Sequence, residues 1–296
     1  MKKQKLKERI KALNASQKKK FKMALIMSLL CVVMLSGATY AWFTISNTAK
    51  VNNLEITVIS EGKLLIGADA NVIRDNKSEH SLKISTQKAL KLYPCTTTTD
   101  GKVMRKPIYT ASDVVTGTDS IATTGSPVAE RERFYYEETI WLGINEAAEV
   151  NNKYAITLAK KNNNIGSYVN VKGTGASHPE YCIRISFTIN QGTADEKTVI
   201  YEPNADVHIT GTKATDNSNA GCTNTFKQNN AGTFINQSGT VYYTGDSSEL
   251  FEITANQPTP VVVRIWFEGT DTDCVNEIQN GSIEGMFTFV SHKKTF

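Results

Sequence analysis

The chain has 296 residues, 40% of them hydrophobic, and its 33 basic and 29 acidic residues give a net charge of +4. Ten of the basic residues and one of the acidic residues precede residue 42, which leaves 23 basic and 28 acidic side chains beyond it. The net charge of that larger part is about −5, which argues against nucleic-acid binding. Its length is sufficient for the core of one large domain or two small ones.

The first 41 residues have the layout of an export signal. Basic residues crowd segment 1–22, an apolar segment spans 23–35, and the small residues Thr39 and Ala41 stand at the minus-3 and minus-1 positions of a signal-peptidase site. We expect a helical signal peptide that is cleaved after Ala41. The alternative is an uncleaved anchor, because segment 23–43 approaches the roughly 20 apolar residues that span a bilayer. Membrane contact is expected only through such an uncleaved leader.

Strand patterns dominate after residue 46. Alternating apolar and polar residues, which put one face on a core and one in water, predict strands at 54–58, 154–158 and 182–189. Shorter apolar runs predict further strands at 63–66, 139–144, 199–201, 241–243, 251–254, 261–267 and 285–290. No window of a dozen residues combines helical spacing with capping signals at both ends. About ten strands joined by polar turns predict an all-β fold, an antiparallel β-sandwich over 53–296.

Two segments are poor in large apolar residues. Segment 94–128 is rich in Thr and contains three prolines, and segment 210–239 is rich in Asn, Thr, Gly and Ser. Such compositions bury little apolar surface, so we expect long inserted loops or edge hairpins there. The alternative is that these segments are flexible linkers between two domains.

The cysteines favour disulfides over a metal site. Cys31 lies in the leader, and the remaining set is even: Cys95, Cys182, Cys222 and Cys274. An exported protein can form disulfides among these four, and the three pairings that they allow stay open. Zinc is the weaker alternative, because the spacings are long and no Cys-x-x-Cys pair occurs.

No pattern of catalytic residues is recognisable. The four histidines, which we expect on exposed loops, are His80, His178, His208 and His292, and none belongs to a His-Glu-x-x-His motif. There is no Gly-x-Ser-x-Gly elbow and no phosphate-binding glycine-rich loop. The sequence also identifies no general base that would activate a cysteine as a nucleophile. We therefore expect no enzymatic activity and no cofactor.

An acidic segment follows the strand predicted at 261–267. Oxygen-bearing side chains on a turn suit calcium, which makes Asp271, Asp273 and Glu277 candidate ligands. The alternative, which we favour, is a solvated turn in which Asp271 or Asp273 caps the backbone and Cys274 cross-links the loop.

The junction around the cleavage site resembles a known family. The sequence Gly-Ala-Thr-Tyr-Ala-Trp-Phe at 37–43, the stretch Ser-Asn-Thr-Ala at 46–49 and the strand at 54–58 resemble the start of proteins of the TasA/camelysin family. The pair Thr44-Ile45 differs from the Ser or Asn followed by Asp that is more frequent there. The resemblance implies a dedicated signal peptidase of the SipW type and a secreted, jelly-roll protein that polymerises into biofilm-matrix fibres in spore-forming Gram-positive bacteria.

The resemblance also gives the new N-terminus a role. Residues 42–52 would form an arm, and Trp42, Phe43, Thr44 and Ile45 would be the assembly strand that adds to the open sheet of the next subunit. The alternative is that this segment is the first strand of its own sandwich, or a disordered stub.

Two functions follow as expectations. The first is a secreted structural protein of the extracellular matrix or cell surface that self-associates into fibres. The alternative is a surface-displayed adhesive or glycan-binding β-sandwich, tethered if the leader is retained. Its contacts would come from Tyr135, Tyr136, Tyr242 and Tyr243.

Overall fold

The structure is a computed structural model. It describes residues 20, 22–24, 26–28, 30, 49–61, 63–75, 81–86, 90–98, 100–109, 115–121, 134–146, 152–159, 166–171, 178–204, 225–228, 234–235, 249–271, 273–274 and 281–294. The chain divides into two compact units, 1–46 and 47–296, and each is described by itself.

The described part of the first unit is helical and apolar on one face. Residues 20, 22–24, 26–28 and 30 are helical. Four large apolar side chains are exposed there: Met23, Ile26, Met27 and Leu30. Their spacing of three and four residues places them along one side of a helix. Among the described residues, no helix is long and apolar enough to cross a bilayer.

The second unit contains a seven-stranded sheet, sheet A, with strands from both ends of the unit. They are β1 (Ala49–Glu61), β3 (Ser81–Thr86), β4 (Leu90–Leu92), β9 (Lys153–Leu158), β10 (Tyr168–Val171), β15 (Phe251–Thr254) and β17 (Gly281–Lys293). The order is β15-β9-β17-β1-β3, with β10 also beside β17 and β4 beside β1. The first strand is therefore an inner strand of its sheet.

A second seven-stranded sheet, sheet B, has the order β14-β13-β12-β11-β16-β8-β2. Its strands are β2 (Leu65–Gly67), β8 (Tyr135–Gly143), β11 (Ile183–Ile189), β12 (Lys197–Glu202), β13 (Thr225–Gln228), β14 (Phe234–Ile235) and β16 (Thr259–Phe267). Two short helical elements accompany the sheets, namely α3 (Ala70–Arg74) and the 3-10 turn η1 (Pro179–Tyr181). The prediction of an all-β fold is confirmed.

Most strand pairs are antiparallel, as expected, but two are parallel. β1 pairs in parallel with β17, from Leu54 opposite Ile283 to Glu61 opposite Val290, and β12 pairs in parallel with β13. On its other side β1 is antiparallel to β3 and β4. Antiparallel meanders alone would not bring the first and last strands of a unit together in this direction, so the pairing is mixed.

The main hydrophobic core lies between sheets A and B. Buried side chains from β9, β10, β15 and β17 of one sheet and from β2, β8, β11, β12 and β16 of the other form one cluster. Phe187 of β11 meets Phe287 and Phe289 of β17 in edge-to-face contacts, with ring centroids 5.7 Å and 5.3 Å apart. Such contacts join the two layers directly.

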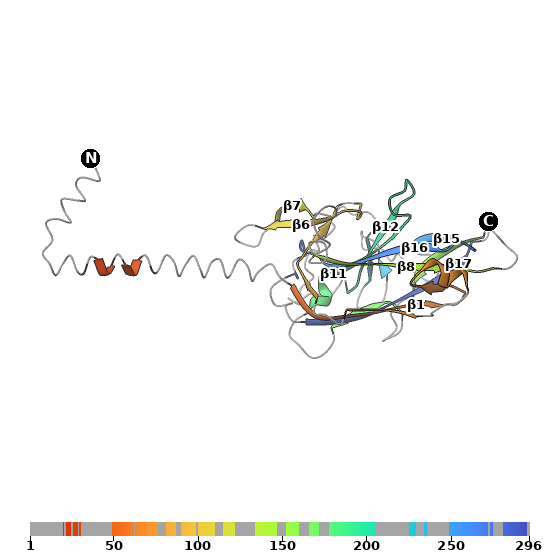
Figure 1. Cartoon of the computed structure of the whole chain (residues 1–296), viewed down its shortest axis with the longest axis horizontal. Helices are drawn as coiled ribbons and strands as arrows, with labels where there is room; N and C mark the ends of the chain where they lie inside the picture. Colours follow the sequence, from red (N-terminus) through yellow and green to blue (C-terminus); the bar gives the residue numbers. More distant parts are fainter. Residues whose placement is uncertain are drawn as a thin grey trace. The chain divides into compact units, whose positions relative to one another are not determined.

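A third, three-stranded sheet covers the outer face of sheet B. It comprises β5 (Thr96–Thr97), β6 (Met104–Tyr109) and β7 (Val115–Ser120), and all three strands lie within the Thr-rich segment 94–128. Figure 1 shows β6 and β7 on one side of β8, β11 and β16, and β1 on the opposite side. A small apolar group, which we call the second cluster, lies beneath it: Cys95, Met104, Ile121, Tyr135, Ile200 and Trp266. The segment expected to form loops or edge hairpins therefore contributes Cys95, Met104 and Ile121 to a small buried cluster.

The structure also corrects the expectation for the strand predicted at 182–189. Every residue of β11 is buried, including Arg184, Ser186 and Thr188, which were expected in water. Alternation still holds, because Ile183, Ile185 and Phe187 belong to the main core. The polar positions face the other side of sheet B, where other parts of the chain cover them.

Candidate functional site

The expected cleavage site and assembly strand fall outside the described residues. This holds for Thr39 and Ala41 and for Trp42, Phe43, Thr44 and Ile45. The end of the expected arm is described, and it belongs to β1. Ala49, Lys50 and Val51 pair with Leu92, Lys91 and Leu90 of β4. From residue 49 onward, the chain is part of its own sheet A.

The clearest group of chemically distinctive side chains lies where β16 ends and β11 begins. We call the residues 268–274 after β16 the acidic turn. The backbone N–H of Glu268 donates to the carbonyl of Cys182 at 2.8 Å, and the N–H of Gly269 donates to the carbonyl of Cys95 at 2.8 Å. Three of the four cysteines considered above therefore gather here, namely Cys95, Cys182 and Cys274, and all three are thiols in the structure. Cys222 lies outside the described residues.

Arg184 holds the acidic turn against sheet B. Its Nη2 lies 2.7 Å from Oδ2 of Asp271 and 3.2 Å from Oε1 of Glu202 on β12, and all three side chains are almost fully buried. A second guanidinium nitrogen donates to the carbonyl of Ile183 at 2.9 Å. One arginine with two buried carboxylates is stable only while the partners stay together, because removing one leaves a buried unpaired charge.

The acidic turn is closed by its own side chains. Oδ1 of Asp271 accepts from the backbone N–H of Asp273 at 2.9 Å, which confirms that Asp271 caps the backbone. Glu268 accepts from Nε1 of Trp266 at 3.0 Å and from the Thr270 hydroxyl at 2.7 Å. The turn is not solvated as expected, because Glu268, Asp271 and Asp273 are at most 5% exposed. Burial raises the pKa of the Glu268 carboxyl, despite these hydrogen bonds.

The calcium interpretation finds no support in the described part of the turn. Both carboxylate oxygens of Asp271 serve Arg184 and the backbone, and Glu277 lies outside the described residues. No three Cys, His, Asp or Glu side chains among the described residues are arranged to hold a metal ion.

His178 is the N-cap residue of the 3-10 turn η1, which directly precedes β11. Its Nδ1 is 2.9 Å from Oε1 of Glu180, and its ring stacks on Tyr181 with centroids 4.7 Å apart. Burial, the Glu180 charge and the Asp273 charge together raise the pKa of Tyr181. His292 of β17 lies 3.2 Å from the hydroxyl of Thr157. His80 and His208 are outside the described residues.

Burial also decides what the thiols can do. It raises the pKa of Cys95 and of Cys182 well above the ordinary value, so both stay protonated at neutral pH. A nucleophilic cysteine requires the opposite shift, since the thiolate is the reactive form. These two buried thiols are therefore suited to packing or cross-linking segments of the fold rather than to nucleophilic catalysis.

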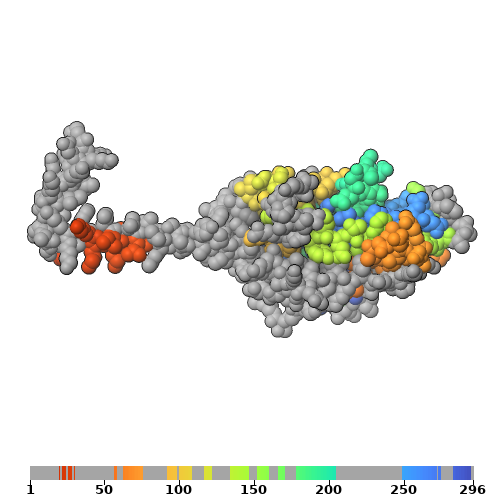
Figure 2. Space-filling view, viewed as in Figure 1, coloured from red at the N-terminus to blue at the C-terminus, as the bar shows by residue number. Residues whose placement is uncertain are grey.

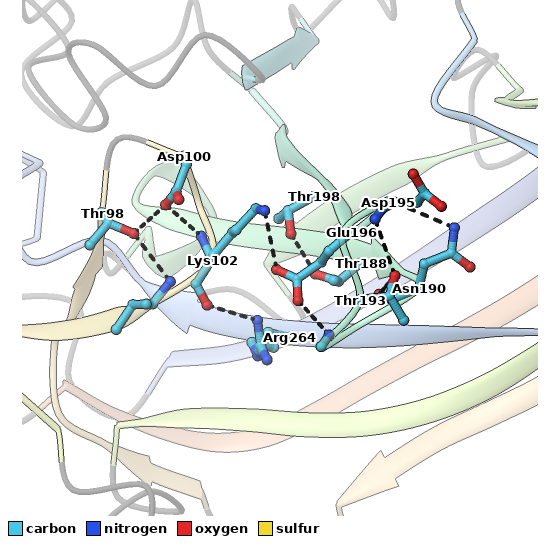
Figure 3. A network of polar contacts seen from close by, with 12 residues as sticks. Thr98, Asp100, Lys102, Thr188, Asn190, Thr193, Asp195, Glu196, Thr198 and Arg264 are labelled. Atoms are coloured by element: carbon cyan, nitrogen blue, oxygen red, sulfur yellow. Dashed lines mark hydrogen bonds and ion pairs between the residues drawn. The ribbon is translucent and has the colours of Figure 1, made fainter.

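A second polar group fixes the third sheet onto sheet B at the β11–β12 hairpin (Figure 3). The Lys102 ammonium lies 3.7 Å from Oε1 of Glu196. The backbone carbonyl of Lys102 accepts a hydrogen bond from Nη1 of Arg264 on β16 at 3.4 Å. Arg264 also binds Glu137 of β8 at 2.7 Å. Figure 2 shows the tip of this hairpin protruding from the surface. These contacts attach the inserted segment by its turn, which the sequence did not indicate.

Two of the four tyrosines proposed as ligand contacts, Tyr135 and Tyr136, are described, and both belong to strand β8. Tyr135 is 3% exposed and belongs to the second cluster. Tyr136 is half-buried and donates its hydroxyl to Glu138, and burial raises its pKa. Tyr242 and Tyr243 lie outside the described residues.

Comparison with known proteins identifies no relative. No family model, no curated protein and no solved structure matches the chain. The resemblance of its N-terminal junction to the TasA/camelysin family therefore supports a proposal, and family membership is not assigned.

Proposed function

We propose that this chain is an exported structural protein of the extracellular matrix or cell surface, of the TasA/camelysin type. Its second unit would be a jelly-roll β-sandwich. A signal peptidase of the SipW type would cleave after Ala41, and the freed N-terminus would add as a strand to a neighbouring subunit and so build fibres.

The observation that carries the proposal is the position of β1. The strand is an inner member of sheet A, paired to β17 on one side and to β3 and β4 on the other. The backbone of β1, from residue 49 onward, is thus already paired within its own sheet. In this proposal the residues between the cleavage site and β1 are those that pair with a neighbouring subunit. This segment, 42–48, contains about seven residues, which is the length of an ordinary strand. We therefore place the assembly strand, with Trp42, Phe43, Thr44 and Ile45, within residues 42–48, and leave out the part of the 42–52 arm that belongs to β1.

Acceptor edges exist on both sheets. Within the described strands, sheet A ends at β3 and β15, and sheet B ends at β2 and β14. An end strand presents backbone donors and acceptors to which an extended segment can pair. In this mode main-chain hydrogen bonds supply affinity, and the side chains of Trp42, Phe43 and Ile45 set the register.

The leader also supports export. Met23, Ile26, Met27 and Leu30 form an exposed apolar helix face, which is costly in water and favourable in a membrane or in the export machinery. Ten basic residues lie before this face, which suits retention of the n-region on the cytoplasmic side.

The test compares two purified proteins, one beginning at Trp42 and one beginning at Asn47. The second lacks residues 42–46, and with them the proposed assembly residues Trp42, Phe43, Thr44 and Ile45, but keeps all of β1. We expect the first to form filaments visible by negative-stain electron microscopy, and the second to stay monomeric with the same circular dichroism spectrum and unfolding temperature. A matched control, Trp42→Tyr with Ile45→Val, keeps large apolar anchors and should polymerise.

Two results would contradict the proposal. Filaments from the protein beginning at Asn47 would show that the segment 42–46 is not the assembly strand. A monomeric protein beginning at Trp42, at concentrations where matrix proteins polymerise and across neutral and mildly acidic pH, would show that fibre formation is not its function. Saturable binding of one sugar by that monomer would favour the adhesive alternative.

A further inference from the structure

The cysteine group at the end of sheet B narrows the choice of disulfide partners. Cys182 directly follows η1, and its carbonyl accepts from the N–H of Glu268 at 2.8 Å, so the acidic turn starts beside it. The N–H of Cys274 then donates to the carbonyl of Asp271 at 3.1 Å, which turns the chain back. Cys274 packs against the main core, to which Cys182 belongs. Besides burial, the nearby Cys274 side chain also raises the pKa of the Cys182 thiol.

Cys95 is excluded as the partner of Cys182 by its place in the sheet. It forms an isolated parallel bridge with Glu268, on the side of that residue opposite Cys182. Strands are about 4.8 Å apart, so two residues that flank a third strand have Cα atoms about 10 Å apart. A disulfide requires a Cα separation below about 7 Å. The side chains also point to different faces, since Cys182 lies in the main core and Cys95 in the second cluster.

Cys95 has its own contact. Its Sγ donates to the carbonyl of Phe134 at 3.3 Å, and it is fully buried. A thiol in this position behaves as a small apolar side chain of the second cluster.

We propose that Cys182 and Cys274 form a disulfide in the exported protein and that Cys95 remains a thiol. In this step the two thiols lose two protons and two electrons and form one sulfur–sulfur bond. The electrons reduce a disulfide of an extracytoplasmic thiol oxidant, which leaves as two thiols. The choice of partners rests on the geometry above, and the oxidation in the cell rests on the proposed export.

The bond would fix the acidic turn to the start of β11. That turn carries Asp271, the partner of Arg184, and the chain beyond it leads to β17, which is the neighbour of β1. A cross-link between residues 182 and 274 closes a long loop, so it restricts the unfolded chain strongly. It would therefore stabilise both sheets, because β17 belongs to sheet A and β11 to sheet B.

Peptide mapping tests the pairing directly. Trypsin cleaves after Lys91, Lys172, Lys213 and Arg264, so each of the four cysteines falls on a different peptide. The protein beginning at Trp42 is refolded in a buffer of oxidised and reduced glutathione, free thiols are alkylated, and the digest is analysed by mass spectrometry without reductant. We expect one linked pair, the Cys182 and Cys274 peptides, and an alkylated Cys95 only when alkylation is carried out in denaturant.

Thermal unfolding provides a second readout that does not require a variant to fold. Adding reductant should lower the unfolding midpoint of the oxidised wild-type protein by about 10 °C. The double variant Cys182→Ser with Cys274→Ser should unfold at the temperature of the reduced protein and should not respond to reductant. Cys222→Ser is the matched control and should retain the full response.

The outcomes separate this inference from the proposed function. A link that involves Cys95 or Cys222, or four free thiols after refolding, would overturn the pairing. A correct link in the refolded protein, together with free Cys182 and Cys274 thiols in protein taken from producing cells, would leave the pairing intact and contradict export.

Discussion

The main core and the second cluster bury apolar side chains on opposite faces of the same sheet, but they are built differently. The main core collects inward positions from many strands of sheets A and B. Among the described residues the second cluster has six buried members, and three of them, Tyr135, Ile200 and Trp266, belong to sheet B itself. The inserted segment thus needs to supply few apolar residues, because the sheet that it covers supplies the others. Low apolar content in a segment does not prevent it from being ordered on a neighbouring sheet.

The two interfaces should also differ in how they open. The main core is stabilised by the apolar surface buried between sheets A and B and by edge-to-face contacts such as that of Phe187 with Phe287. The third sheet is held by a few side chains and by polar contacts at its turn, including the Lys102 pair with Glu196 (Figure 3). Regions with few buried apolar contacts open at lower free energy than the whole domain. We therefore expect the third sheet to unfold locally while sheets A and B remain intact.

The largest effect is expected in the main core. Phe287→Ala removes a fully buried ring between the two sheets and leaves a cavity, so the free energy of unfolding should fall by about 3–5 kcal/mol. Urea titration followed by tryptophan fluorescence measures this loss. Met286→Ala on the other face of β17 is the control and should cost much less. Equal losses for both variants would mean that the space between the sheets is not the dominant core.

A smaller and local effect is expected in the second cluster. Met104 is 2% exposed, and Met104→Ala should cost about 2 kcal/mol, mainly by releasing the third sheet. Hydrogen exchange measured by mass spectrometry should show faster exchange in 96–121 and unchanged exchange in β9 and β17. The neighbouring Val103 is 49% exposed, and Val103→Ala should change neither. Faster exchange throughout the molecule would show that the two clusters unfold as one.

The turn of the third sheet gives a third test. Gly101 has a φ of +73°, and an added Cβ would lie 3.1 Å from Cδ1 of Ile200, so Gly101→Ala should destabilise by about 1–2 kcal/mol. Gly192 has a φ of +78° with open space around it, so Gly192→Ala carries the backbone cost alone. The difference between the two variants isolates the contact of the turn with sheet B. No difference would mean that the turn does not press on Ile200.

The smallest effect is expected from acid. The side chains of Tyr154, Lys63 and Asn152, in that order of effect, lower the pKa of Glu146 from 4.5 to about 2. The unfolded chain therefore binds a proton between pH 5 and 2 that the folded protein does not, and stability falls as pH falls through that window. Glu146→Gln should reduce this slope in urea titrations, and Lys63→Met should reduce it less. An unchanged slope in Glu146→Gln would show that this carboxylate does not stabilise the fold.

The strands were predicted well where alternation is strong and where large apolar residues cluster. The segments expected at 154–158 and 251–254 correspond to β9 and β15, and the longer strands β16 and β17 contain the runs expected at 261–267 and 285–290. The strands β6 and β7 were not predicted individually, because Thr, Pro and basic residues dominate them, and their segment was expected to form loops or edge hairpins. β6 pairs with β5 and β7, and the buried side chain of Met104 belongs to the cluster shared with sheet B, so no local pattern marks these strands.

The parallel pairing of β1 with β17 could not be predicted from the sequence either, since strand order depends on contacts between distant segments. The candidate site was predicted in part. Cys274 and the capping Asp271 were named, but Arg184 was assigned to water because it stands at a polar position of an alternating strand. Only the covering of that face by other segments, which sequence alternation does not encode, makes it buried.

The central claim is that cleavage after Ala41 frees an N-terminal segment for assembly. N-terminal sequencing of the protein recovered from the extracellular matrix of producing cells tests it most directly. The proposal predicts a first residue of Trp42 in the polymeric fraction. A first residue of Met1 in that fraction would contradict it, because the intact leader would then make the chain a tethered surface protein.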